Sequence, residues 1–190
     1  MQHPADPEPG AGSGADQDPP DDILQDLVLE LERHSAEQGW DQPIRLYALV
    51  PTADLVEREP HVAELLGIQG PVPPDALTPV EQDPLPTDQS LEDVLGRLAW
   101  PEAVTGCAMV MERLVVRGSD ATLDPLDTET PADPSSENCE EVRMVAGVLR
   151  DGSTHSALRM RSHDSADSVL NGRELIPGLT SALALTLEAD

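Results

Sequence analysis

Several side chains in the predicted strands could bind an anion. They are five arginines, one tyrosine and one histidine, namely Arg45, Tyr47, Arg113, Arg143, His155, Arg159 and Arg161. A guanidinium group presents paired N–H donors in the geometry that a carboxylate or a phosphate accepts, and a hydroxyl or an imidazole can add a further hydrogen bond. If the fold brings these side chains together, they predict a site for an acidic partner protein or a small anionic ligand.

The positions of three arginines follow from a hairpin that we predict at residues 141–163. Gly152 can adopt the positive φ that closes a three-residue loop between two apolar runs. Because side chains alternate along a strand, a loop of this length places Arg143, Arg159 and Arg161 on one face, with Arg143 opposite Arg159. The other face is predicted to be core, because it carries apolar side chains: Val142, Met144, Ala146, Val148, Leu158 and Met160.

Two interpretations of this arginine face are compatible with the sequence. In the first, the arginines form a solvated outer face and pair with the protein's own acids, which are Glu112, Glu141 and those of residues 119–140. Exposed pairs of this kind contribute no more than about 1 kcal/mol each. In the second, the arginines bind an external carboxylate, phosphate or acidic peptide, and the acidic segment competes for them.

The net charge of the chain restricts its partners. The chain contains 37 acidic and 11 basic residues, which gives a formal charge of −26 at pH 7. Nucleic acids and anionic membranes would be repelled at long range, so we expect neither as a partner. The chain shows no signal peptide, no apolar run of roughly 18 residues, and too few cysteines for a disulfide framework. These features predict a cytoplasmic protein.

The sequence contains no recognised catalytic or metal-binding motif. His163 and Asp164 lie near serines, but no nucleophile elbow or Gly-rich oxyanion segment accompanies them. Cys107 and Cys139 are far apart without nearby histidines, and there is no P-loop or dinucleotide fingerprint. We therefore predict a non-enzymatic binding or adaptor protein that uses no cofactor or metal. The alternative is an enzyme or a small-molecule binder that uses the same arginines as an anion site.

Hydrophobic periodicity predicts the elements that position these residues. Helices are expected at about 22–39, 52–66, 90–99 and from 176 onwards, and strands at 44–50, 104–117 and in both arms of the hairpin. In the second strand, Ala108, Val110 and Leu114 are expected to face the core. The first two strands can then add Arg45 and Arg113 to the arginine face.

The order of these elements predicts an α+β fold. We expect a sheet of about four strands, mainly antiparallel, with the N-terminal, middle and C-terminal helices packed on one face. Residues 1–20 are expected to form a disordered acidic tail rich in proline and glycine. Residues 21–190 are expected to form a single domain with flexible insertions at about 67–89 and 119–140.

Several separated motifs together resemble a known family. They are WDQP at 40–43, RLYALVPT at 45–52, WPEAV at 100–104, ER at 112–113, EVRMV at 141–145 and LRMRSHD at 158–164. In this order they resemble an uncharacterised family of small acidic cytoplasmic proteins from high-GC Gram-positive bacteria, over roughly residues 22–188. The resemblance implies a single soluble bacterial domain and supplies no catalytic residue.

Overall fold

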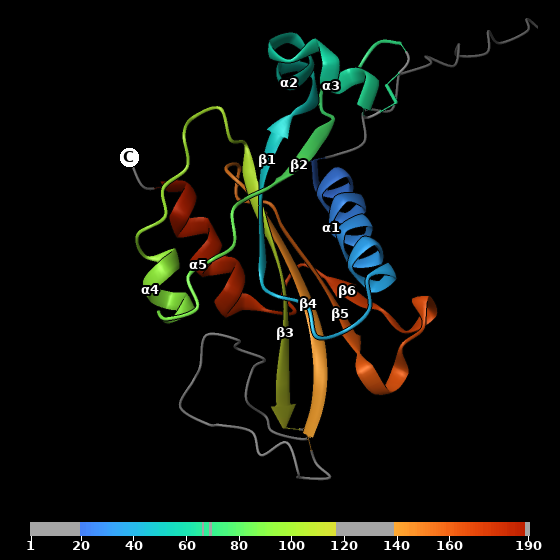
Figure 1. The fold of residues 1–190 in the computed structure, drawn as a ribbon, viewed down its shortest axis with the longest axis vertical. Helices are drawn as coiled ribbons and strands as arrows, with labels where there is room; N and C mark the ends of the chain where they lie inside the picture. Colours follow the sequence, from blue (N-terminus) through green and yellow to red (C-terminus); the bar gives the residue numbers. More distant parts are fainter. Residues whose placement is uncertain (1–19, 66, 69, 117–138, 189–190) are drawn as a thin grey trace, which may run out of the picture.

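Six strands form one antiparallel sheet in the part of the chain that the computed structural model describes, residues 20–65, 67–68, 70–116 and 139–188. The strand order is β2-β1-β3-β4-β5-β6 (Figure 1). The strands are β1 (Arg45–Pro51), β2 (Leu77–Glu81), β3 (Gly106–Val116), β4 (Cys139–Leu149), β5 (Thr154–Met160) and β6 (Leu170–Gly172). The helices are α1 (Pro20–Glu37), α2 (Thr52–Arg58), α3 (Pro60–Leu65), α4 (Leu91–Leu95) and α5 (Pro177–Glu188), with 3₁₀ turns η1 (Arg161–His163) and η2 (Ala166–Ser168). The predicted α+β class is confirmed.

The β4–β5 hairpin has the predicted register. Arg143 pairs with Arg159, and Met144 pairs with Leu158. The Leu149 N–H donates to the Ser153 carbonyl at 2.9 Å, which leaves residues 150–152 as a three-residue loop, and Gly152 adopts a φ of 91° within it. A positive φ is accessible to glycine at little cost, so this residue sets the loop length and hence the face that each later side chain occupies.

Both faces of the sheet are covered by helices, whereas the sequence predicted helices on one face. Helix α1 lies on one side, and α4 and α5 lie on the other (Figure 1). The reason is that β3 and β4 carry apolar side chains on both faces of the sheet. In β3, Met109 and Met111 are buried toward α5, and Ala108 and Val110 are buried toward α1. A strand that is apolar on both sides requires a cover on both sides.

Helix α1 approaches the sheet closely where it crosses β4. Its apolar stripe includes Leu24, Val28 and Leu31, which are buried. At Gly147 an added Cβ would lie 2.8 Å from Val28 Cγ2 and 2.9 Å from Leu24 Cδ1. The absence of a side chain at this position therefore allows the helix to pack directly on the strand.

Two strands were missing from the sequence prediction. The proline-rich segment 67–89 contains β2, which pairs with β1 at the edge of the sheet. Its Pro79 is compatible with this place, because an edge strand needs backbone donors on one side alone. The short β6 forms the other edge. Residues 1–19 of the predicted acidic tail and residues 119–138 of the predicted second insertion lie outside the described residues. Pro20, predicted in the tail, begins α1, and Cys139 and Glu140, predicted in the insertion, begin β4. Within the described ranges, no helix combines the length and apolar composition needed to span a bilayer.

Candidate functional site

Two of the predicted arginines, Arg143 and Arg159, are buried side by side under α1. Arg143 donates from Nε and Nη2 to Glu112 Oε1, at 3.1 and 2.8 Å, and from Nη2 to the Gly39 carbonyl. Arg159 donates from Nε and Nη2 to the two carboxylate oxygens of Glu32, at 2.6 and 2.8 Å. Each buried guanidinium therefore has a carboxylate of this chain as its partner.

Trp40 connects the arginines to each other. The guanidinium carbon of Arg143 lies 4.4 Å from the ring centroid, and that of Arg161 lies 5.5 Å away. Such distances allow cation–π attraction. The indole Nε1 donates to Asp164 Oδ2 at 2.9 Å, and Arg159 Nη1 donates to Asp164 Oδ1 at 3.2 Å.

Residues 38–42 form a strap that joins α1 to β1 and closes this group of side chains. The backbone N–H groups of Asp41 and Gln42 donate to Glu112 Oε2 at 2.7 and 3.1 Å. Arg161 pairs with Asp41 at 3.1 Å and with Glu141 at 2.5 Å. We call the whole group the arginine–tryptophan network: Glu32, Trp40, Asp41, Glu112, Glu141, Arg143, Arg159, Arg161 and Asp164.

The network is negative overall, although the sequence suggested a positive face. Three arginines meet five carboxylates, an excess of two negative charges. Hydrogen bonding to Glu32 raises the pKa of Arg159, and hydrogen bonding to Asp41 and Glu141 raises that of Arg161. The hydrogen bond from Trp40, aided by Arg159, lowers the pKa of Asp164. These three groups are therefore held in their charged forms at neutral pH.

The other predicted residues on the α1 face also have local partners or are covered. Arg45 donates to Gln38 and to Gln42 Oε1, the latter at 3.0 Å. Tyr47 is buried, its hydroxyl has no hydrogen-bond partner in the described chain, and burial raises its pKa. His155 is buried, and its Nε2 lies 3.3 Å from Asn171 Oδ1. None of these three presents an open anion site.

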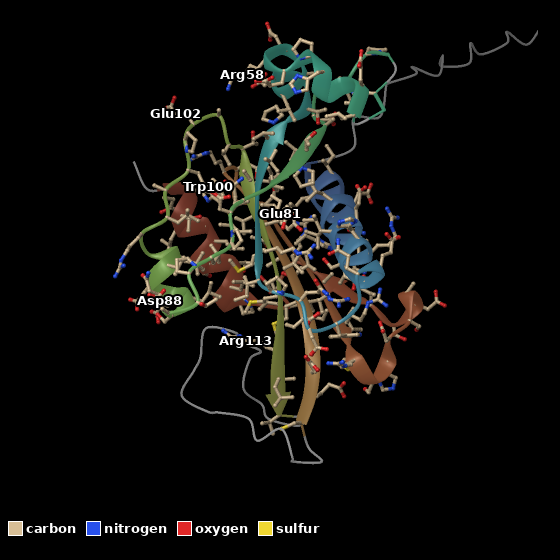
Figure 2. All side chains as sticks on the ribbon, viewed as in Figure 1. Arg58, Glu81, Asp88, Trp100, Glu102 and Arg113 are labelled. Carbon is tan, nitrogen blue, oxygen red and sulfur yellow. The ribbon has the colours of Figure 1, made fainter. Side chains whose placement is uncertain are left out.

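Arg113 lies on the opposite face of the sheet from Arg143, although the sequence analysis grouped them. In the β3–β4 register Glu112 pairs with Arg143, so the next side chain points to the α4 and α5 side. Figure 2 shows Arg113 extending from β3 away from α1. Among the described residues it has no hydrogen bond or ion pair to a side chain or carbonyl, and its Nε is buried.

Arg113 lines a pocket of about 540 Å³. Apolar residues from the position before β1, from the segment before α4 and from α4 itself form most of its wall: Ile44, Leu85, Pro86, Leu91 and Val94. None of the described residues in the lining is acidic, although the chain has 37 acids. The described lining therefore carries one positive charge on a mostly apolar wall.

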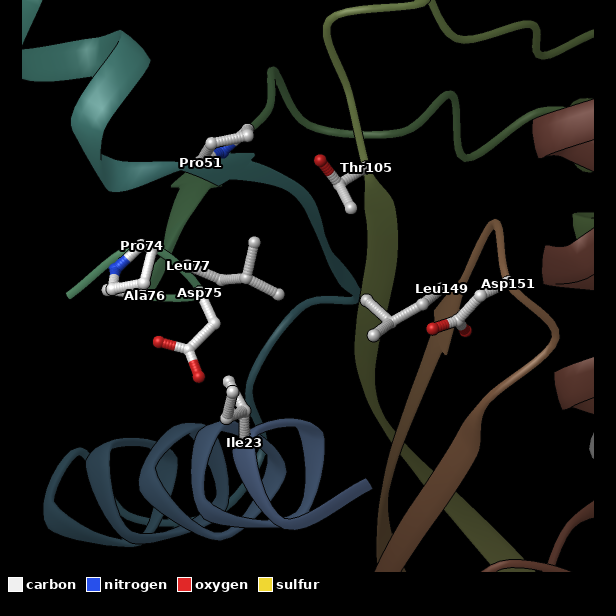
Figure 3. Close-up of a pocket in the computed structure, with 9 residues that line it drawn as sticks. All are labelled: Ile23, Pro51, Pro74, Asp75, Ala76, Leu77, Thr105, Leu149 and Asp151. Carbon is white, nitrogen blue, oxygen red and sulfur yellow. The ribbon is translucent and has the colours of Figure 1, made fainter. Parts of the chain in front are cut away.

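A second pocket at the other end of the sheet has different chemistry. It has a volume of about 220 Å³ and lies between Ile23 of α1 and the start of β2. Two carboxylates line it, Asp75 and Asp151, and Figure 3 shows them on opposite walls. No arginine or histidine is among the described lining residues. This pocket would repel an anion.

Sequence reasoning missed Glu32 and Trp40 as members of the network. Glu32 follows Leu24 and Val28 at four-residue steps, so it lies on the apolar stripe of α1. A carboxylate on such a stripe predicts a buried cation opposite it, and this was the available signal. Trp40 gave no comparable signal, because its partners come from β4, η1 and the residue after η1.

Arg150, in the hairpin loop, also has a structural role that was not predicted. It donates to four backbone carbonyls: Val104 at 2.8 Å, Trp100 at 3.0 Å, Pro101 at 3.3 Å and Leu187. These hydrogen bonds connect the end of α5 and the turn before β3 to the hairpin loop.

No group of three or more His, Cys, Asp or Glu side chains suited to a metal ion occurs in the described portion of the molecule.

The described residues define a class of α+β protein in which an antiparallel six-stranded sheet lies between helical layers. The chain belongs to the PPA1309-like protein family, whose model matches residues 24–188. The matched range includes the whole arginine–tryptophan network and the Arg113 pocket. Searches of curated proteins and of solved structures find no match.

Proposed function

We propose that this protein is a non-enzymatic binding or adaptor protein of the cytoplasm of a high-GC Gram-positive bacterium, and that it recognises an acidic partner. The observation that carries the proposal is the state of Arg113. Arg113 lines a pocket whose described lining contains no acidic residue, and its buried Nε has no hydrogen-bond partner among the described residues. An arginine in this state can bind a carboxylate without breaking an ion pair that it already makes.

The buried arginines are less suited to this role. An external carboxylate at Arg143 or Arg159 would displace Glu112 or Glu32 from a buried pair. Leaving such a charge unpaired costs about 3–5 kcal/mol. Arg161 is more accessible, but it already contacts Asp41 and Glu141. We therefore assign partner binding to Arg113 and a structural role to the arginine–tryptophan network.

The lining of the pocket favours binding over catalysis. The described lining contains no histidine, cysteine, lysine, aspartate or glutamate that could act as a general acid, base or nucleophile. Its Ser90 is the N-cap of α4 and hydrogen-bonds Asp93. A small-molecule binder is the second candidate, because a volume of about 540 Å³ is in the range of ligand sites.

The proposal is tested by co-purification of the full-length chain and two matched variants. Arg113→Gln removes the charge in the pocket, and Arg58→Gln removes a charge on α2, at the other end of the molecule (Figure 2). We expect wild type and Arg58→Gln to retain the same acidic partner and Arg113→Gln to lose it. Retention of the partner by folded Arg113→Gln, with folding checked by circular dichroism, contradicts the proposal.

A further inference from the structure

We propose that the Arg113 pocket binds a small monocarboxylate that carries an apolar chain. This inference rests on the proposed function, because both use Arg113 as the anion contact, and it names the chemical class of the ligand. Four properties of the pocket lead to it: its charge, the Arg113 Nε that lacks a partner among the described residues, the apolar wall and the prolines in that wall.

The charge of the pocket matches a single negative charge. Arg113 is the one ionisable side chain among the described lining residues. A carboxylate balances it one to one. A phosphate monoester carries about −1.5 to −2 at neutral pH, so part of its charge would be uncompensated in a chain of −26. The pocket therefore favours a monoanion.

The donors of Arg113 match a carboxylate head group. Its Nε is buried and has no partner among the described residues, which leaves a donor unsatisfied. A carboxylate can accept from Nε and one terminal nitrogen together, in the bidentate geometry that Glu32 adopts with Arg159 in this same protein. Binding of such a head group would satisfy the buried donor.

The rest of the lining matches an apolar chain. Seven of its twelve residues are apolar, and these include Ile44, Leu85 and Leu91. Three of the four uncharged polar side chains in the described lining are already engaged: Gln42 with Arg45, Gln89 with Arg97, and Ser90 with Asp93. A ligand with one polar head and an apolar body is therefore the best chemical fit.

Three prolines restrict the backbone of the pocket wall. Pro43, Pro84 and Pro86 line it, and each has a φ restricted by its ring. Ser90 fixes the start of α4 by accepting a hydrogen bond from the Asp93 N–H at 3.1 Å. Little ordering is needed when a ligand enters a wall of this kind, so less of the binding free energy is lost.

Calorimetric titration of the full-length protein with octanoate at neutral pH, below its micelle concentration, tests this inference. We expect octanoate to bind wild type and Arg58→Gln equally, and Arg113→Gln at least about tenfold more weakly. Octan-1-ol lacks the charge and acetate lacks the chain, so both should bind at least about tenfold more weakly than octanoate. Affinity should rise about fourfold per methylene from butanoate to octanoate.

A second measurement keeps the test valid if Arg113→Gln does not fold. In wild type, octanoate should shift the Arg113 Nε–H resonance, assigned with Arg113→Lys, and leave that of Arg58 unchanged. Equal affinity for octan-1-ol and octanoate, or an unshifted Arg113 resonance at saturation, overturns the inference.

If octanoate does not bind while Arg113→Gln still loses the acidic partner, this inference fails and the proposed function stands. If octanoate binds through Arg113 while the variant keeps its partner, the proposed function fails.

Discussion

Glu112 and Arg113 are consecutive residues of β3 whose charged groups lie on opposite faces of the sheet. Glu112 is inside the arginine–tryptophan network, and Arg113 lines the pocket. Gln42 belongs to both regions, because its backbone N–H donates to Glu112 and the same residue lines the pocket. The strap that closes the network is thus also part of the pocket wall, and the register of β3 positions both.

Arg143→Ala is expected to lower the free energy of unfolding by about 3–5 kcal/mol, because it leaves Glu112 as an unpaired buried charge. The variant also loses the contact with Trp40. Urea unfolding measured by circular dichroism checks this value. The matched control is Arg161→Ala, a half-exposed arginine that contacts the same ring, for which we expect a loss of about 1 kcal/mol or less. Similar losses for the two variants would contradict a structural role for the buried pair.

Arg150→Ala is expected to lower the free energy of unfolding by about 1–3 kcal/mol, because four carbonyls lose a charged donor. Arg150→Lys should recover less than half of the loss, since an ammonium group cannot reach divergent carbonyls as a guanidinium fork does. Urea unfolding gives both values. Arg33→Ala serves as the control, because Arg33 has an exposed pair with Glu30. The assignment fails if Arg150→Ala is as stable as this control.

Alkaline pH should destabilise the protein through Cys107. This thiol is buried beneath α5, and burial raises its pKa from 9.0 to about 11. The folded state therefore binds the proton more tightly than the unfolded state, so the stabilising effect is complete below pH 9 and is lost as pH rises toward 11. The loss should reach about 3 kcal/mol, at about 1.4 kcal/mol per pKa unit.

Comparison with Cys107→Ala isolates this effect, since Tyr47 also has a raised pKa and titrates in the same direction. Between pH 9 and 11 the free energy of unfolding should fall more steeply for wild type than for Cys107→Ala. Equal slopes would show that the thiol is not the group responsible.

Removal of residues 119–138 is expected to strengthen octanoate binding several-fold at low salt. This segment contains six acids and no basic residue, and it begins shortly after Arg113 in the sequence. Its removal makes the net charge of the chain less negative by six, which favours binding of an anion, and added salt should reduce the gain. A variant of unchanged length with the six acids replaced by amides separates charge from chain length. Unchanged affinity in both variants would exclude competition by this segment.

The hairpin was predictable from the sequence because its geometry is local. Gly152 fixes a three-residue loop, and counting from it gives the pairing of Arg143 with Arg159. The class of the fold followed from the order of the elements. The sequence of β3 is also apolar at both odd and even positions, and this pattern indicates that helices cover both faces of the sheet.

The ion pairs were not predictable because their partners are distant in sequence. Glu32 and Arg159 are separated by 127 positions, and Glu112 and Arg143 by 31. The position of Arg113 depends on the register between β3 and β4, which the long connecting segment does not fix. Arginines that alternate with apolar residues therefore predict an exposed face, although Arg143 and Arg159 are buried with partners from other elements.

The two tryptophans are divided between the two helical layers, and this gives the molecule a pair of optical reporters. Trp40 contacts Arg143 on the α1 side, whereas Trp100 is buried on the α5 side and donates to Thr186 Oγ1 at 3.0 Å. Because the chain has two tryptophans and one tyrosine, Trp40→Phe and Trp100→Phe leave one dominant fluorophore in each layer. Coincident unfolding curves would define the sheet and both layers as one cooperative unit, and separated curves would define layers that detach in sequence.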